Sequence, residues 1–324
     1  MDPTLIQEGS YGCAFTPPLK CRKSKQSRSK RQVGKIIRLK NAEVELSIAS
    51  IVKGIPGWER YFIVQEKDNC TAQNFKNFRE AYEEECKTLR RRADKELVQL
   101  LSPYGGTTLH SLAITNDFDY LGAFRHMLEG VSKLAKQGIC HYDLHEGNIL
   151  VDHRGTMRLI DFGAAFVGDA VSEETIWRHQ YSFSPEYSPQ PPELSIQNAL
   201  NENVPLSFAI HKTFQQKKEF SIASSLLGQR GQEDAMFNFW RSEFSSTSQW
   251  PTFFHKYWRT WDSWAVGVIF LKLLRKSFLL SSFTHTVWPK HGFTIRTVLK
   301  GLLEVDPRRR LTADTALKMI NASA

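Results

Sequence analysis

Residues 141–148 read HYDLHEGN and decide the fold of this 324-residue chain. They place an aspartate and an asparagine five residues apart, directly after residues 118–134, where apolar side chains recur every three or four positions. That period predicts an amphipathic helix. Residues 159–163 read LIDFG, and the turn-rich segment 152–156 before them predicts a hairpin loop. The sequence therefore predicts a long helix followed by two loops that each carry an aspartate.

The two loops resemble those of the protein kinase superfamily, whose catalytic loop reads H-R-D-x-x-x-x-N and whose metal loop reads D-F-G. Phosphoryl transfer needs hard oxygen ligands for Mg²⁺ and a carboxylate that accepts the proton of the substrate hydroxyl. The resemblance implies that Asp143 is the catalytic base and that Asn148 and Asp161 bind Mg²⁺. Taken alone, Asp161 could end a strand and Asn148 could cap a turn. Their order and spacing favour the catalytic interpretation.

The N-terminal region contains two further features of this resemblance. Residues 8–15 read EGSYGCAF, a glycine-containing hairpin whose backbone N–H groups could approach a phosphate chain, although such a segment is more often only a hairpin. Residues 33–37 read VGKII and put Lys35 at the position of the phosphate-contacting lysine. Its expected partner is Glu45, with Glu43 as the second choice. The nucleotide-binding residues that the resemblance implies are Ile6, Gly9, Ser10, Tyr11, Gly12, Ala14, Lys35, Leu101 and Tyr104.

Three later motifs also resemble this family and occur in its order. Residues 191–193 read PPE, residues 262–267 read DSWAVG, and residues 306–310 read DPRRR. The resemblance implies a buried ion pair between Glu193 and Arg310, in which the loss of one partner would strand the other charge. The neighbouring Arg308 and Arg309 are expected to lie on a solvated face.

The resemblance covers residues from about 6 to 320 and implies a bilobal α+β fold, with a small antiparallel β-sheet N-lobe and a large, mainly helical C-lobe. The expected divisions are an N-lobe at 1–102 with a basic loop at 20–31, a hinge at 103–107 and a C-lobe at 108–324. Within the C-lobe the expected segments are a catalytic loop at 141–148, an activation segment at 161–193 and a helical insertion at about 195–258. Strand-like runs that agree with the sheet lie at 5–15, 33–39, 61–65 and 97–101.

Two segments have no counterpart among the motifs of this family. The chain runs 69 residues from Glu193 to Asp262, which is longer than the family's usual connection. The 195–258 insertion could therefore be a docking surface, or a helical elaboration without a role in recognition. The basic run 20–31 is expected to be a solvated loop. No nucleic-acid partner is expected, because no aromatic side chains alternate with its charges to stack on bases.

Two residues of the catalytic loop depart from the family pattern. Tyr142 replaces the arginine that grips a phosphorylated activation loop in many kinases, so we expect no such phosphate switch. His145 replaces the lysine that contacts the transferred phosphate, and its charge would depend on pH. The motif D-L-H-x-G-N also resembles the corresponding motif of aminoglycoside kinases. Since those enzymes usually lack the three later motifs, a protein substrate is favoured over a small molecule.

Composition sets the remaining expectations. Hydrophobic residues make up 41% of the chain and charged residues 24%, which is typical of a globular protein, and the net charge of +9 suits an acidic or phosphate-bearing partner. The five cysteines form no C-x-x-C pair, so we expect free thiols in a reducing, intracellular and cytoplasmic location, with no membrane span. Several motifs are similar to those of serine/threonine kinases of large nucleocytoplasmic DNA viruses, which implies host cytoplasm or virion.

The sequence therefore predicts a serine/threonine protein kinase that uses ATP and Mg²⁺ and acts on protein substrates. Its catalytic residues would be Asp143, Lys35, His145 and Glu45. Two alternatives remain open. One is an inactive kinase-like scaffold, which the presence of the expected lysine, aspartates and asparagine disfavours. The other is a small-molecule phosphotransferase of the same fold.

Overall fold

The computed structural model describes residues 3–9, 12–20, 29, 31–71, 86–88, 97–243 and 250–322. The chain divides into two compact units. Unit 1 consists of Met1–Gly106 and the later segment Arg158–Ala164, and unit 2 consists of Thr107–Met157 and Ala165–Ala324. The lobe boundaries drawn from the sequence stay a prediction.

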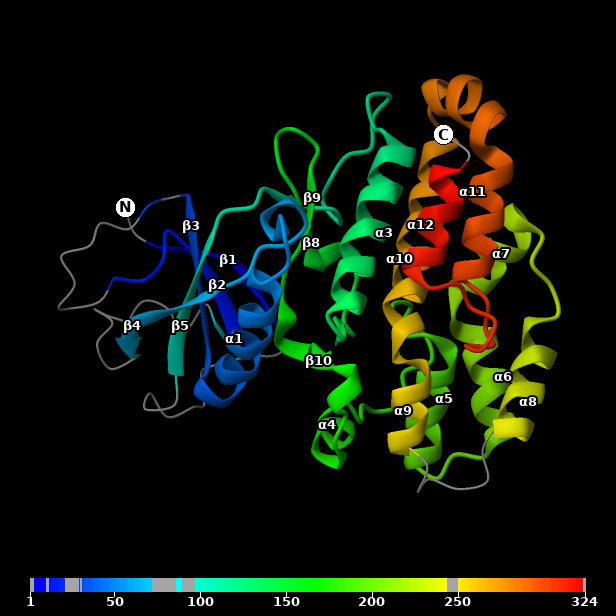
Figure 1. The fold of residues 1–324 in the computed structure, drawn as a ribbon, viewed down its shortest axis with the longest axis horizontal. Helices are drawn as coiled ribbons and strands as arrows, with labels where there is room; N and C mark the ends of the chain where they lie inside the picture. Colours follow the sequence, from blue (N-terminus) through cyan, green and yellow to red (C-terminus); the bar gives the residue numbers. More distant parts are fainter. Residues whose placement is uncertain are drawn as a thin grey trace. The chain divides into compact units, whose positions relative to one another are not determined.

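Unit 1 is built on a five-stranded antiparallel sheet with the strand order β1-β2-β3-β5-β4 (Figure 1). The strands are β1 (Thr4–Glu8), β2 (Gly12–Thr16), β3 (Gln32–Arg38), β4 (Glu66–Thr71) and β5 (Leu97–Pro103). Helix α1 (Leu39–Lys53) begins directly after β3, and the 3₁₀ turn η1 (Trp58–Arg60) follows it. Ile37, Ala42, Val98 and Leu100 form a buried apolar cluster that joins α1 to the sheet.

Residues 61–65 form a buried connection in place of the strand expected there, and β4 begins only at Glu66. Leu159 N donates to the carbonyl of Tyr61 at 2.8 Å, and Ile63 N donates to the carbonyl of Leu159 at 2.9 Å. These bonds tie the connection to Arg158–Ala164, which explains why that segment belongs to unit 1. The apolar run is therefore buried against a distant segment instead of continuing the sheet.

A disulfide joins Cys13 of β2 to Cys86, with their Cα atoms 6.1 Å apart. The expectation of free thiols is wrong for these two residues, because the sheet brings together cysteines that are 73 residues apart in sequence. Disulfides persist mainly in oxidising compartments, so cysteine usage no longer argues for a reducing one. Cys140 is a buried free thiol. Cys21 and the side chain of Cys70 lie outside the described residues.

Unit 2 is mainly helical (Figure 1). Its α-helices are α3 (Tyr120–Lys136), α4 (Glu173–Arg178), α5 (Pro192–Asn201), α6 (Leu206–Gln216), α7 (Lys218–Leu227), α8 (Gln232–Glu243), α9 (Trp250–Tyr257), α10 (Trp261–Ser277), α11 (Trp288–Leu302) and α12 (Ala313–Asn321). Two pairs of short strands lie in this unit: β6 (Thr107–Thr108) with β8 (Ile149–Val151), and β7 (Ile139–Cys140) with β10 (Phe166–Val167). A further short strand, β9 (Met157–Leu159), spans the boundary of the two units in the sequence. An antiparallel sheet unit and a helical unit confirm the predicted α+β fold.

Helix α10 is the central packing element of unit 2 and contacts α3, α7 and α11. Its side chains are buried nearly all round, as its apolar sequence predicts. Phe270 of α10 stacks on Phe124 of α3 with ring centroids 4.4 Å apart, and Tyr120 donates its hydroxyl to the carbonyl of Phe270 at 2.9 Å. This contact fixes α3, the helix that leads into the HYDLHEGN loop.

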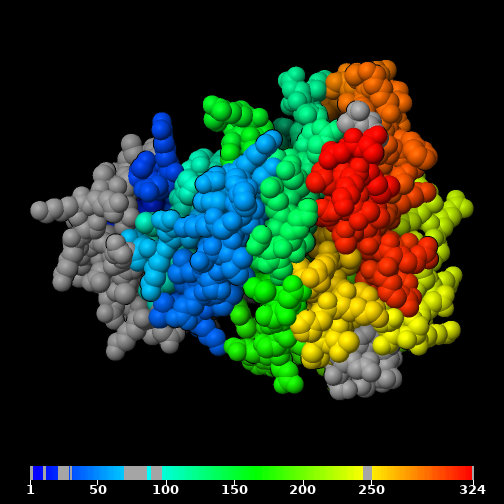
Figure 2. Space-filling view, viewed as in Figure 1, coloured from blue at the N-terminus to red at the C-terminus, as the bar shows by residue number. Residues whose placement is uncertain are grey.

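The insertion expected at about 195–258 contributes helices α6, α7, α8 and α9 to unit 2. Figure 2 shows the C-terminal segment (red) beside the α8–α9 region (yellow) on one face of this unit. None of the described helices combines the length and the apolarity that a membrane span requires.

Candidate active site

The first functional cluster lies in unit 1 and consists of Lys35, Glu45 and Asp161. The Lys35 ammonium donates to both Glu45 carboxylate oxygens, at 3.2 and 3.0 Å, and to Asp161 Oδ1 at 2.7 Å. The side chains of Lys35 and Glu45 are 11% and 4% exposed, whereas that of Asp161 is 33% exposed. One cation is therefore shared by a buried carboxylate and a more accessible one.

The short spacing between Lys35 and Glu45 follows from the direct passage of β3 into α1. Since Arg38 ends the strand and Leu39 begins the helix, Glu45 lies on the second turn of α1 and needs no longer connection. Glu45 is buried and faces the lysine, while Glu43, the second choice, lies on the exposed face of α1. The helix phase therefore selects Glu45.

Burial and charge oppose each other in this cluster. Desolvation by burial is the largest influence on Lys35 and would lower its pKa, but the Asp161 and Glu45 carboxylates outweigh it and raise the pKa above the usual value. For Glu45, burial raises the pKa more than the Lys35 ammonium lowers it, and the Asp161 charge adds to the rise. Lys35 thus stays charged across the physiological range.

The backbone of Asp161 has a φ of 62°, in the left-handed region that is costly for a residue with a side chain. The turn η5 (Phe162–Ala164) that follows packs against α1, and the buried Phe162 ring meets Phe62 edge-on at 6.1 Å. Gly163 N donates to Asp161 Oδ1 at 3.3 Å. The packing of Phe162 and this bond hold Asp161 in a strained conformation that brings its carboxylate to Lys35.

The second cluster lies in unit 2, on the HYDLHEGN loop. Asn148 Nδ2 donates to the backbone carbonyl of Asp143 at 2.9 Å and to its carboxylate at 3.3 Å. Gly147 N donates to His145 Nδ1 at 3.0 Å, and His145 Nε2 lies 3.8 Å from Asp143 Oδ2. The accepting role of Nδ1 places the imidazole proton on Nε2, which faces the aspartate.

Asp262 at the start of α10 fixes the beginning of this loop. Its carboxylate accepts from the backbone N–H groups of His141 at 2.7 Å and Tyr142 at 2.9 Å. Burial raises the pKa of Asp262, while His141 and the backbone N–H donors lower it. Tyr142 has a φ of 70°, and its ring packs edge-on against His179 at 4.6 Å. Asp262 of the central helix α10 thus fixes the start of the loop. The Tyr142 ring contacts His179 in the segment after α4.

Two residues that the motifs do not predict bear on Asp143, one by direct contact and one through the backbone of the first. Tyr187 donates its hydroxyl to Asp143 Oδ1 at 2.6 Å. Lys217, which is buried between α6 and α7, donates to the carbonyls of Tyr187 at 2.6 Å and Gln190 at 3.1 Å. Neither residue belongs to a local motif. The insertion containing Lys217 is predicted as a docking surface or a helical elaboration, and no sequence signal distinguishes Lys217 within it.

The proposed nucleotide-binding residues of unit 1 lie in different places on the sheet. Ala14 pairs directly with Lys35, so both side chains face the same side. Leu101 pairs with Gly34 and therefore faces the opposite side, away from Lys35. Ile6 lies at the irregular step of β1, and both it and Tyr104 are about half exposed.

Gly9 and Gly12, at the β1–β2 turn, each have a structural role. Gly9 N donates to the carbonyl of Gly12 at 2.9 Å and closes the turn. A Cβ at Gly12 would collide with the backbone of Ile36, so glycine is required there for β2 to approach β3. Ser10 and Tyr11 lie outside the described residues. A role of these residues in phosphate binding stays a prediction.

The predicted pair between Glu193 and Arg310 is confirmed. Arg310 Nη1 and Nη2 donate to the two Glu193 oxygens at 2.7 and 2.8 Å, and both side chains are 0% exposed. The arginine also donates from Nε to the carbonyl of Glu304 at 2.7 Å and from Nη2 to that of Val305 at 3.1 Å. This pair joins the start of α5 to the segment before α12.

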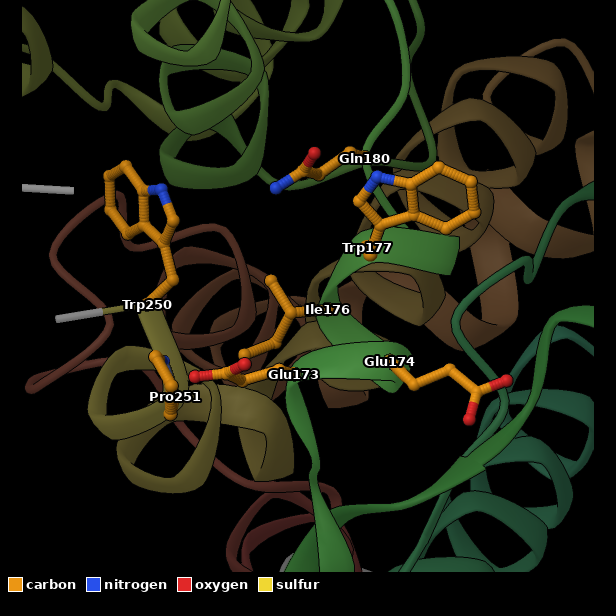
Figure 3. A pocket seen from close by; sticks show the side chains of 7 residues that line it. All are labelled: Glu173, Glu174, Ile176, Trp177, Gln180, Trp250 and Pro251. Atoms are coloured by element: carbon orange, nitrogen blue, oxygen red, sulfur yellow. The ribbon is translucent and has the colours of Figure 1, made fainter. Parts of the chain in front are cut away.

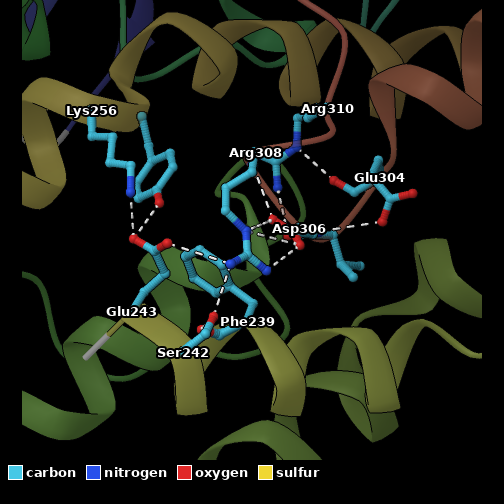
Figure 4. Close-up of polar contacts among 10 residues, drawn as sticks. Phe239, Ser242, Glu243, Lys256, Glu304, Asp306, Arg308 and Arg310 are labelled. Atoms are coloured by element: carbon cyan, nitrogen blue, oxygen red, sulfur yellow. Dashed lines mark hydrogen bonds and ion pairs between the residues drawn. The ribbon is translucent and has the colours of Figure 1, made fainter. Parts of the chain in front are cut away.

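Arg308, expected on a solvated face, is exposed but has several polar partners. Figure 4 shows its guanidinium between Asp306 and Glu243. It binds both Asp306 oxygens, at 2.8 and 3.1 Å from Nε and 2.6 Å from Nη2, and Nη1 lies 3.4 Å from Glu243. Its guanidinium also packs on the Phe239 ring of α8. The arginine therefore links the C-terminal segment to the insertion.

Comparisons with known proteins found similarity to protein kinases over part of the chain. Residues 70–204, less than half of the chain, match the family described as protein kinase domain. An 82-residue stretch is 30% identical to serine/threonine-protein kinase PSK1 of Saccharomyces cerevisiae. That stretch covers 22% of this chain and 6% of the yeast protein. The matched segments and the α+β fold support the protein kinase superfamily for this chain.

Proposed function

We propose that this chain is a protein kinase that transfers the γ-phosphate of ATP to serine or threonine hydroxyls of proteins. The observation that carries the proposal is the Lys35 ammonium, which binds both Glu45 and Asp161, residues 10 and 126 positions away in sequence. A lysine oriented by one carboxylate beside a second, more accessible one suits the binding of a nucleotide phosphate chain and its metal.

Within this proposal Lys35 binds the α- and β-phosphates, and Glu45 holds its ammonium in position. Asp161 and Asn148 fit Mg²⁺ because they offer hard oxygen ligands. Asn148 donates through Nδ2, so its carbonyl oxygen is the atom suited to a metal. When bound, Mg²⁺ would neutralise charge on the phosphates. Asp143 accepts the proton of the substrate hydroxyl, and its carboxylate is oriented by Asn148.

His145 is assigned an auxiliary role. Because its Nδ1 accepts from Gly147, its Nε2–H is directed to the Asp143 side of the loop, where it can donate to a phosphate oxygen. A neutral imidazole supplies a donor but no charge, in contrast to the lysine common at this position. We therefore expect His145 to contribute less to the rate than Asp143 or Lys35.

The proposal of a protein substrate, phosphorylated on serine or threonine, rests on several features together. The Glu193–Arg310 pair and the Asp262 contacts support a protein acceptor, because aminoglycoside kinases usually lack the corresponding motifs. Preference for serine and threonine rests on the motif likeness and the yeast relative. The likeness to viral kinases and the cytoplasmic location stay predictions.

A pocket of unit 2 offers a place for protein docking, and the insertion contributes Trp250 and Pro251 to its lining. It has a volume of about 590 Å³ and lies between α4 and α9. Figure 3 shows Trp177 and Trp250 on different sides of it. Glu173 and Glu174 add two acidic side chains, and Trp177 is 74% exposed. Carboxylates beside indole rings suit the basic side chains of a peptide, which can bind by charge and by cation–π contact.

The test compares wild type with Asp143→Asn in an assay of autophosphorylation and of a generic acceptor protein, using radiolabelled ATP. We expect labelling to fall by at least about 100-fold, because proton acceptance is removed. Asp117→Asn, a change of an exposed aspartate, is the matched control and should leave labelling unchanged.

Equal labelling by wild type and Asp143→Asn would contradict the proposal. An absence of labelling by wild type itself would favour the inactive scaffold. Labelling of an amino sugar or a nucleoside without labelling of protein would favour the small-molecule phosphotransferase.

A further inference from the structure

Tyr187 contacts the proposed catalytic base in the way that an acceptor hydroxyl would. Its hydroxyl donates to Asp143 Oδ1 over 2.6 Å, the length of a hydrogen bond to a charged carboxylate. A base must lie within hydrogen-bond distance of the hydroxyl that it deprotonates, and Tyr187 already meets that condition. The residue lies between α4 and α5 and is 42% exposed, so the ring can leave without opening the core.

Hydrogen bonds from the insertion hold the backbone around Tyr187 in place. Lys217, which is 1% exposed, donates to the carbonyls of Tyr187 and Gln190 at 2.6 and 3.1 Å. On the other side, Tyr187 N donates to the carbonyl of Ser184 at 3.0 Å and closes a turn. Two anchors therefore fix the main chain while the side chain reaches the loop. All of these residues belong to unit 2.

We propose that the Tyr187 hydroxyl occupies the acceptor position at Asp143 and that the hydroxyl of a protein substrate must displace it. The inference rests on the proposed role of Asp143 as the base. It adds an internal competitor of the acceptor, and it gives the insertion a function, because Lys217 holds the competitor's backbone in place.

Competition of this kind has a defined kinetic signature. The apparent affinity for the acceptor is reduced by the fraction of molecules in which Tyr187 is displaced. A saturating acceptor overcomes the competitor, so kcat is unchanged while the KM for the acceptor is raised. The nucleotide does not compete with Tyr187 for Asp143 Oδ1, so the KM for ATP should not change.

The experiment uses Tyr187→Phe, which keeps the exposed ring and removes only the hydroxyl. We expect the KM for a serine- or threonine-containing acceptor peptide to fall about tenfold, the effect of losing one charge-assisted hydrogen bond. We expect kcat and the KM for ATP to stay within about twofold of wild type. Tyr181→Phe is the matched control, since Tyr181 is 40% exposed in the same segment and its ring stacking on Tyr142 survives in phenylalanine.

Three outcomes would overturn the inference. An unchanged KM for the acceptor means that Tyr187 does not compete. A lower kcat in Tyr187→Phe means that Tyr187 positions Asp143 instead of blocking it. Phosphotyrosine at position 187, found by mass spectrometry of wild type incubated with ATP, means that the residue is itself an acceptor.

The Asp143→Asn variant separates this failure from failure of the proposed function. If Asp143→Asn retains wild-type activity, Asp143 is not the base and the proposed function fails with the inference. If Asp143→Asn is inactive and Tyr187→Phe behaves as wild type, the inference alone fails.

Discussion

Lys35 in unit 1 and Lys217 in unit 2 are both largely buried, yet their pKa values shift in opposite directions. Burial would lower both values. At Lys35 the carboxylates of Asp161 and Glu45 outweigh burial and raise the pKa. At Lys217 burial dominates and lowers the pKa to about 8, although Glu219 and Glu193 partly oppose it.

The difference lies in the groups that each ammonium contacts. Lys35 donates to two carboxylates, whereas Lys217 donates to two backbone carbonyls, which have dipoles but no net charge. A charged partner stabilises the ammonium strongly in a low-dielectric site, and a carbonyl does so weakly. The Lys35 ammonium therefore keeps its positive charge and is suited to bind phosphate oxygens. Lys217 is suited to anchor a segment of main chain.

The largest effect is expected for Lys35→Met, which removes the cation shared by the two carboxylates. Loss of one preorganised electrostatic contact to reacting groups typically costs about 100- to 1,000-fold in rate, so we expect phosphorylation to fall by that factor. Initial rates at saturating ATP measure it. Lys53→Met is the control, because Lys53 pairs with Glu66 in an exposed ion pair, and its rate should stay within about twofold. Similar rates for both variants would contradict the role of Lys35.

The variant Arg310→Met tests whether the stability of unit 2 also depends on a charged pair. The change leaves the Glu193 carboxylate buried and unpaired, which typically costs about 3–5 kcal/mol of the free energy of unfolding. Urea denaturation measures this difference. Arg309→Met, a change of the exposed neighbour, should stay within about 0.5 kcal/mol of wild type. A loss below about 1 kcal/mol in Arg310→Met would show that the pair contributes little to stability.

The smallest effect concerns the pH dependence of Lys217. Folding lowers its pKa from 10.5 to about 8, so between these values the unfolded state binds more protons than the folded state. The free energy of unfolding therefore rises with pH across that window, by about 3 kcal/mol from this residue. Lys217→Met lacks the titrating group. The difference in unfolding free energy, wild type minus variant, should thus increase from pH 8 to pH 10.5.

Urea denaturation of both proteins at several pH values tests this expectation. Two curves that stay parallel from pH 8 to pH 10.5 would mean that Lys217 titrates as an ordinary lysine. In that case the contrast between the two lysines would disappear.

Residues within one short segment were predictable from the sequence. Asp143 and Asn148 lie five positions apart, and the structure brings their side chains into contact through Asn148 Nδ2. The sequence favours Glu45 over Glu43 as the partner of Lys35 despite the short separation, and the direct start of α1 after β3 explains how that separation suffices. The strand expected at 61–65 was wrong, because its partner Leu159 lies almost a hundred residues later.

Local sequence patterns predict the α+β class, the long helix before the HYDLHEGN loop and the charged residues of the motifs. These follow from periodicity and from spacing over a few residues, which the backbone geometry of helices and turns converts directly into position. Three other features are visible only in the folded chain: Arg158–Ala164 joins unit 1, Cys13 meets Cys86, and Tyr187 reaches Asp143 while Lys217 holds its backbone. Each of these joins residues far apart along the chain, and packing of the whole unit, not local preference, selects such contacts.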